Sequence, residues 1–305
     1  MWEYFSFDFL YIFLGIFVLV YLAVYEYINY ATNSTNKISS EQQTVGSYGY
    51  GLCNGPHTWR QNFLAAQGEC QSPVNLQSEC AIVVHVETLT NPLEFSREYC
   101  APPCDMFLIN DGHTINIYPE YGRSNPPTIQ GGPLDREYEL YGLCLRWGPN
   151  DEEGSEHMVD NKRYAMEMQV TFMCRGHRNL YIAAEAGDVI MVAYMFQATH
   201  MDNPYLDEIL SYAGSTNIVF EKFCIETVPI SLLAPCFSKG YYSYVGSLTY
   251  PPCTEGVRWI VQPEPLSVSY DQMKRLRKTP MIYCDLKNNT RPVQELHNRE
   301  IIFYD

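Results

Sequence analysis

Short apolar segments, separated by glycine and proline, constrain the fold of this 305-residue chain more than any other feature of its sequence. The clearest segment is 165–173, where apolar and polar side chains alternate. Its apolar set is Met166, Met168, Val170 and Phe172, and its polar set is Glu167, Gln169 and Thr171. Alternation with a period of two is typical of a β-strand whose two faces meet different surroundings. The pattern therefore predicts a strand at 165–173.

Further apolar runs of this length follow from about Gly51 onward and are also predicted to be strands. They lie at 81–86, 106–110, 113–118, 138–147, 188–196 and 257–261. Within 138–147, strict alternation places Glu139, Tyr141, Leu143 and Leu145 on one face. Strands outnumber helices in this interpretation, so the fold class is mostly β (α+β), in a single domain without internal repeats.

Two segments carry helix signals. The first, 203–213, follows the start signal Asp202-Asn203-Pro204. The second, 269–278, has Ser269 as its N-cap and lysines and arginines in its last turns, where cations suit the helix dipole. We predict a helix at each.

The amino-terminal residues 9–25 form a run of 17 residues without charge. This length is at the short end of a membrane span. Acidic residues precede the run and no small-residue cleavage site follows it, so a retained signal-anchor is favoured over a cleaved signal peptide or a soluble apolar helix. We divide the chain into an anchor at 1–30, a flexible Ser/Thr/Asn-rich stalk at 31–50, and a globular domain at 51–305.

Charge and cysteine content bear on location and partners. The net charge of −15 disfavours nucleic acid, because phosphate binding needs an excess of cations. Eleven cysteines and two glycosylation sequons, at Asn33 and Asn288, favour a lumenal or extracellular domain. The expected location is therefore a single-pass membrane protein with its C-terminal domain lumenal or extracellular, or a protein secreted after signal cleavage.

Four short motifs occur in a suggestive order. They are Gln71-Ser72-Pro73-Val74-Asn75, Gly131-Gly132-Pro133-Leu134, Gly154-Ser155-Glu156-His157, and the segment 247–255, which reads SLTYPPCTE. In this order and spacing the chain resembles the α-class carbonic anhydrases, over about residues 48–303. The resemblance implies one domain around a large twisted, mainly antiparallel central sheet, with a conical pocket that reaches its centre.

In the enzymes of that family, three histidines on two neighbouring strands hold a zinc ion, and a bound water takes the fourth position. The resemblance places the matching positions of this chain at Cys144, Arg146 and Gln169. All three histidines are thus replaced, and Arg146 puts a permanent cation where the metal would lie. We expect no zinc, no other cofactor and no efficient hydration of carbon dioxide.

Other pocket positions match the family. His113 corresponds to its proton-shuttle histidine, Thr249 and Glu156 to the pair that orients the zinc-bound hydroxide, and Glu167 to the carboxylate behind a ligand histidine. Without metal, Thr249 and Glu156 are expected to keep a buried hydrogen bond. Arg146 needs a buried partner, with Glu156 and Glu167 as candidates. Arg146 and Thr249 also form a candidate anion pocket, for a small anion such as bicarbonate.

The cysteines receive expectations from the same resemblance. Secreted members carry a disulfide that ends at the position of Cys253, and Cys70 is its candidate partner here, with Cys53 second. Cys100 and Cys104 are either a local pair or free thiols. Cys144 is expected to be a buried thiol.

Three functions compete. The first is a non-catalytic carbonic anhydrase-related domain on a membrane that binds an unidentified protein partner or serves as a structural module. The second is an enzyme with residual or altered carbonic anhydrase or hydrolase activity, for which no nucleophile–base motif is evident. The third is an accessory subunit of a membrane assembly.

Overall fold

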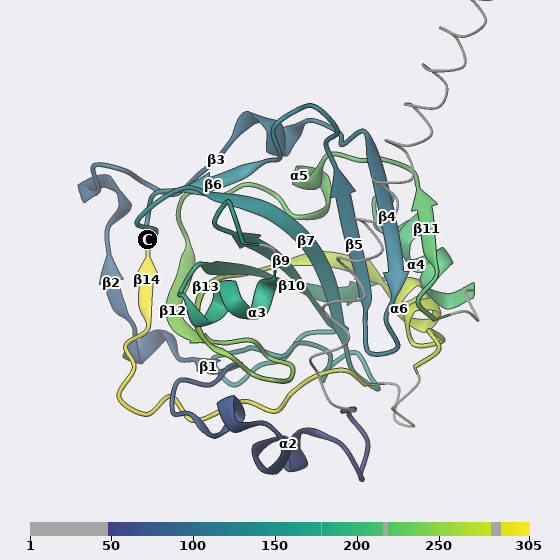
Figure 1. Ribbon diagram of the computed structural model, residues 1–305, viewed down its shortest axis with the longest axis horizontal. Helices are drawn as coiled ribbons and strands as arrows, with labels where there is room; N and C mark the ends of the chain where they lie inside the picture. The colour runs from purple at the N-terminus through teal and green to yellow at the C-terminus, as the bar shows by residue number, and fades with distance from the viewer. Residues whose placement is uncertain (1–47, 178, 216–218, 282–287) are drawn as a thin grey trace, which may run out of the picture. The chain divides into compact units, whose positions relative to one another are not determined.

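The computed structural model describes residues 48–177, 179–215, 219–281 and 288–305 (Figure 1). The predicted anchor, the sequon at Asn33 and most of the predicted stalk lie outside these residues. Among the helices in the described ranges, none is long and apolar enough to cross a membrane. The globular unit begins earlier than predicted, because Tyr50 is buried against Trp59.

The described chain is rich in strands, as the apolar runs predicted. The strands are β1 (Asn75–Leu76), β2 (Ile82–Val84), β3 (Glu94–Phe95), β4 (Asp105–Asn110), β5 (Ile115–Glu120), β6 (Thr128–Gln130), β7 (Tyr138–Trp147), β8 (Met158–Val159), β9 (Met166–Met173), β10 (Val189–Thr199), β11 (Lys222–Ile225), β12 (Tyr241–Ser247), β13 (Glu255–Ser269) and β14 (Ile302–Tyr304). The α-helices are α2 (Pro56–Asn62), α3 (Leu180–Glu185), α4 (Asp207–Ser215), α5 (Ile230–Leu233) and α6 (Tyr270–Leu276). Short 3-10 turns are η1 (Leu64–Gln67), η2 (Ser78–Cys80), η3 (Val86–Thr88) and η4 (Arg97–Cys100).

One large mixed sheet organises the domain. Its main path runs β11-β4-β5-β7-β9-β10-β13-β12-β14-β2, with β3 and β6 attached beside β7. Most neighbouring pairs are antiparallel, whereas β10 with β13 and β14 with β2 are parallel. In Figure 1, β4, β5 and β11 lie at one side of this sheet and β2 and β14 at the other. The prediction of a mainly antiparallel central sheet is confirmed.

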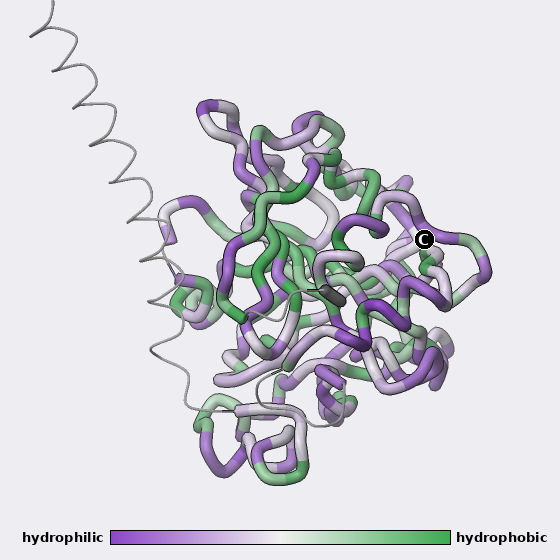
Figure 2. Tube along the Cα trace, turned by 90° about the vertical axis from the view of Figure 1, so that its right-hand side faces the viewer, coloured by the Kyte–Doolittle hydropathy of each residue, from purple (hydrophilic) through white to green (hydrophobic). Residues whose placement is uncertain are grey.

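Both faces of the central strands are buried. Along β10, Ile190 and Val192 join one core cluster, while Met191 and Ala193 join another on the opposite face. Successive strand residues point to opposite faces, so one strand serves two cores. Figure 2 shows the apolar segments gathered in the interior and the polar segments at the periphery.

One predicted face is wrong. In β7 the register against β9 shifts between Leu140 and Gly142, which marks a β-bulge. Leu140 therefore packs in the same core cluster as Leu143, whereas Glu139 and Tyr141 lie outside that cluster. A bulge inserts one residue and reverses the alternation on one side of it, which strict period-two reasoning cannot foresee.

The two predicted helices both exist. The Ser269 side chain caps α6 by accepting a hydrogen bond from the backbone amide of Gln272. The Gln272 side chain accepts in turn from the backbone amide of Ser269, which completes a capping box. The other helix, α4, begins at Asp207 rather than at Asn203. Asn203 instead forms a turn, in which its backbone carbonyl accepts from the Leu206 amide.

Candidate functional site

The three substituted positions lie together on β7 and β9. Cys144 pairs with Gln169 and Arg146 pairs with Glu167 across the two strands. Their neighbours Leu145 and Met168 belong to the larger core cluster. Because side chains alternate, the four polar residues share the opposite face of the sheet.

The Gln169 side-chain amide holds this group together. Its Oε1 atom accepts from Arg146 Nε at 3.2 Å and from Cys144 Sγ at 3.6 Å. Its Nε2 atom donates to Glu156 Oε2 at 2.7 Å and to Glu167 Oε1 at 2.9 Å. We call Cys144, Arg146, Glu156, Glu167 and Gln169 the polar cluster.

Arg146 is only 1% exposed and is paired within the protein. Its Nε atom lies 3.5 Å from Glu156 Oε2, and its Nη1 atom donates to the Tyr50 hydroxyl at 3.2 Å. The guanidinium carbon also lies 5.0 Å from the centre of the Tyr250 ring, within cation–π range. Burial works against the charge, but Tyr50 and Glu156 outweigh it and raise the pKa of Arg146 above its usual value. The predicted partner Glu156 is confirmed, and the arginine stays charged.

Glu156 reaches the polar cluster through a tight loop before β9. The amides of Gly154 and Ser155 both donate to the Tyr164 carbonyl, at 2.8 and 2.9 Å. A Cβ atom on Gly154 would come within 1.7 Å of the Ala165 carbonyl oxygen, so only glycine fits here. Burial raises the pKa of the Glu156 carboxyl, and Arg146 opposes this shift.

Glu167 is bound mainly to backbone and to a histidine. Its Oε2 atom accepts from the amides of Glu156 and His157, at 2.9 and 2.8 Å. Its Oε1 atom lies 3.0 Å from His157 Nδ1, and His157 Nε2 lies 2.7 Å from the Tyr244 hydroxyl. Burial alone would raise the pKa of Glu167, but His157 and these hydrogen bonds lower it overall. Glu167 therefore holds the 156–157 loop in place and is not the partner of Arg146.

The Glu167 contacts carry a prediction. Replacing Glu167 with glutamine should destabilise the domain by about 1–3 kcal/mol at neutral pH, because one buried donor loses its acceptor. The pKa of Glu167 is lowered on folding, so its contribution is present above the unfolded pKa and is lost as pH falls. Urea unfolding of E167Q and wild type should therefore differ by a constant amount from pH 7 to about 5 and converge as pH falls below about 4.3 toward 3. A difference that stays constant between pH 5 and pH 3 would contradict the role given to the carboxylate.

Thr249 and His113 lie at the edge of the polar cluster. The buried Thr249 hydroxyl is close enough to Glu156 to lower the pKa of that carboxyl, yet Thr249 Oγ1 has no hydrogen bond of good geometry within the described residues. The predicted Thr249–Glu156 pair is close in space, and a hydrogen bond between the two side chains stays a prediction. The His113 ring stacks on Tyr48, with centroids 3.9 Å apart, and burial lowers the pKa of His113.

Cys70, Cys253 and Cys53 are free thiols in the structure, and the Cys70–Cys253 disulfide stays a prediction. Cys253 is fully buried beside Trp59 and Ala66, whereas the Cys70 amide is held by the Glu255 carboxylate at 2.7 Å. The Gln71 side chain also donates to the Cys253 carbonyl at 3.2 Å, so the two segments lie beside each other. Cys144 is buried, as expected.

At the second sequon, the Asn288 side-chain oxygen accepts from the Thr290 amide at 2.9 Å and from its hydroxyl at 2.7 Å. Glycosylation at Asn288 stays a prediction.

Sequence reasoning missed three residues of the site. Tyr50 was assigned to the stalk, although it accepts from Arg146, and Tyr250 was not singled out. His157 was named only as part of a motif, although its ring lies between Glu167 and Tyr244. A buried arginine is itself a signal that aromatic and carboxylate partners must be nearby, but it does not say which ones.

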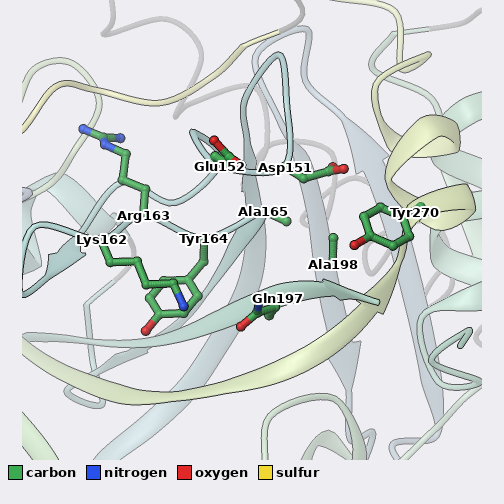
Figure 3. Close-up of a pocket in the computed structure, with 9 residues that line it drawn as sticks. All are labelled: Asp151, Glu152, Lys162, Arg163, Tyr164, Ala165, Gln197, Ala198 and Tyr270. Atoms are coloured by element: carbon green, nitrogen blue, oxygen red, sulfur yellow. The ribbon is translucent and has the colours of Figure 1, made fainter. Parts of the chain in front are cut away.

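A cavity of about 480 Å³ lies elsewhere on the domain (Figure 3). Its lining contains no member of the polar cluster and consists of Asp151, Glu152, Lys162, Arg163, Tyr164, Ala165, Gln197, Ala198 and Tyr270. Two of its charged groups already have partners, since Arg277 pairs with Asp151 at 2.6 Å and Lys162 lies over the Tyr164 ring. The motifs do not point to this cavity.

The donor set of the polar cluster does not fit zinc. Cys144 is the one member of the three positions that can become an anionic ligand, and burial raises the pKa of its thiol to about 11. Gln169 Oε1 already accepts from Arg146 and Cys144, and Arg146 carries a fixed positive charge. Within the described residues, no group of three or more His, Cys, Asp or Glu side chains is placed to hold a metal ion.

A large mixed sheet with a buried polar cluster on its central strands defines the class of this protein. The family of eukaryotic-type carbonic anhydrases matches residues 54–305, and the chain belongs to that family. It is 31% identical over 261 residues to carbonic anhydrase 7 of Homo sapiens and, at the same identity and length, to carbonic anhydrase 7 of Mus musculus. Each alignment covers 83% of this chain and 96% of the relative.

Proposed function

We propose that this chain is a catalytically inactive carbonic anhydrase-related protein. The single observation that carries the proposal is the state of Arg146, which is buried, charged and paired with Glu156 at 3.5 Å. A guanidinium at a metal-ligand position occupies the space of the ion and repels it. Two unit positive charges at 4 Å repel by about 4 kcal/mol at an effective dielectric of 20, and a divalent ion doubles this to roughly 8 kcal/mol.

The polar cluster is also complete without an ion. The Gln169 amide uses its oxygen for Arg146 and its nitrogen for Glu156 and Glu167. Fully satisfied buried networks make a site rigid, whereas a half-satisfied one is costly. The network thus supports a role for the cluster in holding the domain together.

The domain would then act as a protein-binding or structural module, held at a membrane by residues 9–25. One surface feature supports binding. Strand β2 ends the sheet order, and its Ile82 and Val83 side chains are 47% and 51% exposed. An apolar edge strand is a surface that other chains can pair with.

Metal content and activity test the proposal together. We expect the full-length chain, purified without chelator in the presence of zinc, to contain far less than one zinc per molecule. Its hydration of carbon dioxide should equal the buffer rate, because a low-pKa zinc-bound water is the source of the reactive hydroxide in zinc hydrases. Human carbonic anhydrase 7, treated identically, is the positive control.

Stoichiometric zinc together with turnover would overturn the inactive assignment. The membrane part has its own check, since the full chain should stay with membranes after an alkaline carbonate wash. Release by that wash would refute the anchor and leave the inactive assignment standing.

A further inference from the structure

Two cysteines that are distant in sequence lie side by side on the surface of the domain. Cys100 ends the 3-10 turn η4, and Cys236 follows helix α5, which packs against η4. Both residues are exposed, and both are free thiols in the structure. The two thiols are neighbours, because Cys100 is near enough to raise the pKa of Cys236. From sequence, Cys104 was the candidate partner of Cys100.

Aromatic packing fixes the segments that carry this pair. The Phe95 ring contacts Tyr99, which precedes Cys100, with centroids 4.8 Å apart. It also contacts Phe237, which follows Cys236, with centroids 5.5 Å apart. On the other side of Cys236, the Tyr194 hydroxyl donates to the Pro235 carbonyl at 2.8 Å. The core thus holds both backbones in place beside the thiol pair.

The local alternative fits less well. The amide of Cys104 donates to the Glu120 carbonyl at 2.8 Å, which ties Cys104 to the pairing of β4 with β5. Its sulfur lies beside Gly122, 3.4 Å from the point where a Cβ atom would stand on that glycine. Cys100 therefore lies beside α5, whereas Cys104 lies beside the end of β5.

We propose that Cys100 and Cys236 form a disulfide bond when the domain meets an oxidising compartment. Both segments pack against the Phe95 ring, so neighbouring thiols on them need little movement to reach bonding distance, and disulfides persist in secretory and extracellular spaces. The bond would link η4 to α5 across a long stretch of chain. This inference does not depend on the proposed function.

The oxidant is a small disulfide such as glutathione disulfide. A Cys100 thiolate attacks one of its sulfurs, a mixed disulfide forms, and one glutathione thiolate leaves and takes up a proton. Cys236 then loses its proton, its sulfur attacks the Cys100 sulfur, and the second glutathione leaves and is protonated. Two cysteine thiols are oxidised and one glutathione disulfide is reduced to two thiols, with no net change in protons.

The order of attack follows from the site. Partial burial of its thiol, with Cys100 next to it, raises the pKa of Cys236 to about 12, so Cys236 is rarely a thiolate at neutral pH. We propose that Cys100 begins the exchange and Cys236 completes it. A C236S variant should stop at glutathione bound to Cys100.

Peptide mapping tests the bond. No lysine or arginine separates Cys100 from Cys104, or Cys224 from Cys236, so trypsin leaves each pair on one peptide. We therefore use the full-length chain with C104S and C224S, reduce it, desalt it and oxidise it with glutathione disulfide at pH 8. Mass spectrometry without reduction should find the peptide with Cys100 linked by a disulfide to the peptide with Cys236. This link should be missing in C100S/C104S/C224S.

Wild type provides the second measurement. Fragmentation of its linked peptides should place the bond between Cys100 and Cys236. A bond from Cys100 to Cys104 in wild type would overturn the proposal, as would glutathione on both Cys100 and Cys236 without a link in C104S/C224S.

Discussion

Replacing Arg146 with methionine should destabilise the domain by roughly 3–5 kcal/mol at pH 8, because removing one partner of a buried ion pair leaves the other charge uncompensated. The charge left behind is that of Glu156, which is fully buried and lies 3.5 Å from Arg146 Nε. Methionine keeps much of the length of the arginine stem, so the variant tests the charge more than the packing.

The loss should depend on pH. Burial raises the pKa of Glu156 and Arg146 lowers it, so removing Arg146 raises that pKa further. A group whose folded pKa is raised contributes its stability below the unfolded pKa, near 4.3 for glutamate, and loses it as pH rises through the folded pKa. The R146M variant should therefore be closer to wild type at pH 5 than at pH 8.

Urea unfolding at the two pH values measures this, with two comparison variants. R146M/E156Q removes both charges, and its loss should be smaller than that of R146M and nearly independent of pH. R97M removes an arginine whose side chain is 95% exposed, and it should change stability by less than about 0.5 kcal/mol. Equal stability of R146M and wild type at both pH values would show that the ion pair is not a structural element.

The fold was largely predictable because period-two alternation depends on burial alone. The polar side of β9, Glu167 and Gln169, was identified from sequence and lies on the face opposite Met168. The bulge in β7 was not, since nothing in the residues around Leu140 marks an insertion against the partner strand. The start of α4 was placed too early, because a capping signal also suits a turn such as the one at Asn203.

The positions of the site residues were predictable from the motifs. The hydrogen-bond partners of the long side chains were not, because they depend on the folded loops. Cys144, Arg146 and Gln169 meet as expected, because cross-strand neighbours share a face. Glu156 and Glu167 were equal candidates for Arg146, and only the folded loop separates their roles. Glu167 is used by backbone amides and His157, which leaves Glu156 for the arginine.

This division gives Glu156 and Glu167 a structural role that does not depend on catalysis. Glu167 closes the 156–157 loop through two backbone amides, and Glu156 accepts from the Arg291 amide at 2.9 Å. Each would cost stability if lost, whatever the domain does, because a buried donor would be left unpaired. Their presence therefore says more about the fold than about the reaction.

Restoring histidine at all three positions should restore zinc binding. In C144H/R146H/Q169H, the side chains lie on one face of two paired strands, the arrangement that three protein ligands need. We expect about one zinc per chain retained through gel filtration. Glu156 loses its partner Arg146 in this variant, so bound zinc would also supply the missing positive charge.

The decisive comparison is C144H/Q169H, which offers two imidazoles but keeps Arg146. We expect it to retain no zinc, because the guanidinium repels the ion. Thermal unfolding with zinc and with chelator gives the second readout. Ligand at a thousand times its dissociation constant stabilises by about 4 kcal/mol, which should appear in the triple variant alone. If C144H/Q169H bound zinc as tightly as the triple variant, Arg146 would not be the group that excludes the metal; if neither bound it, the three positions would not converge on one site.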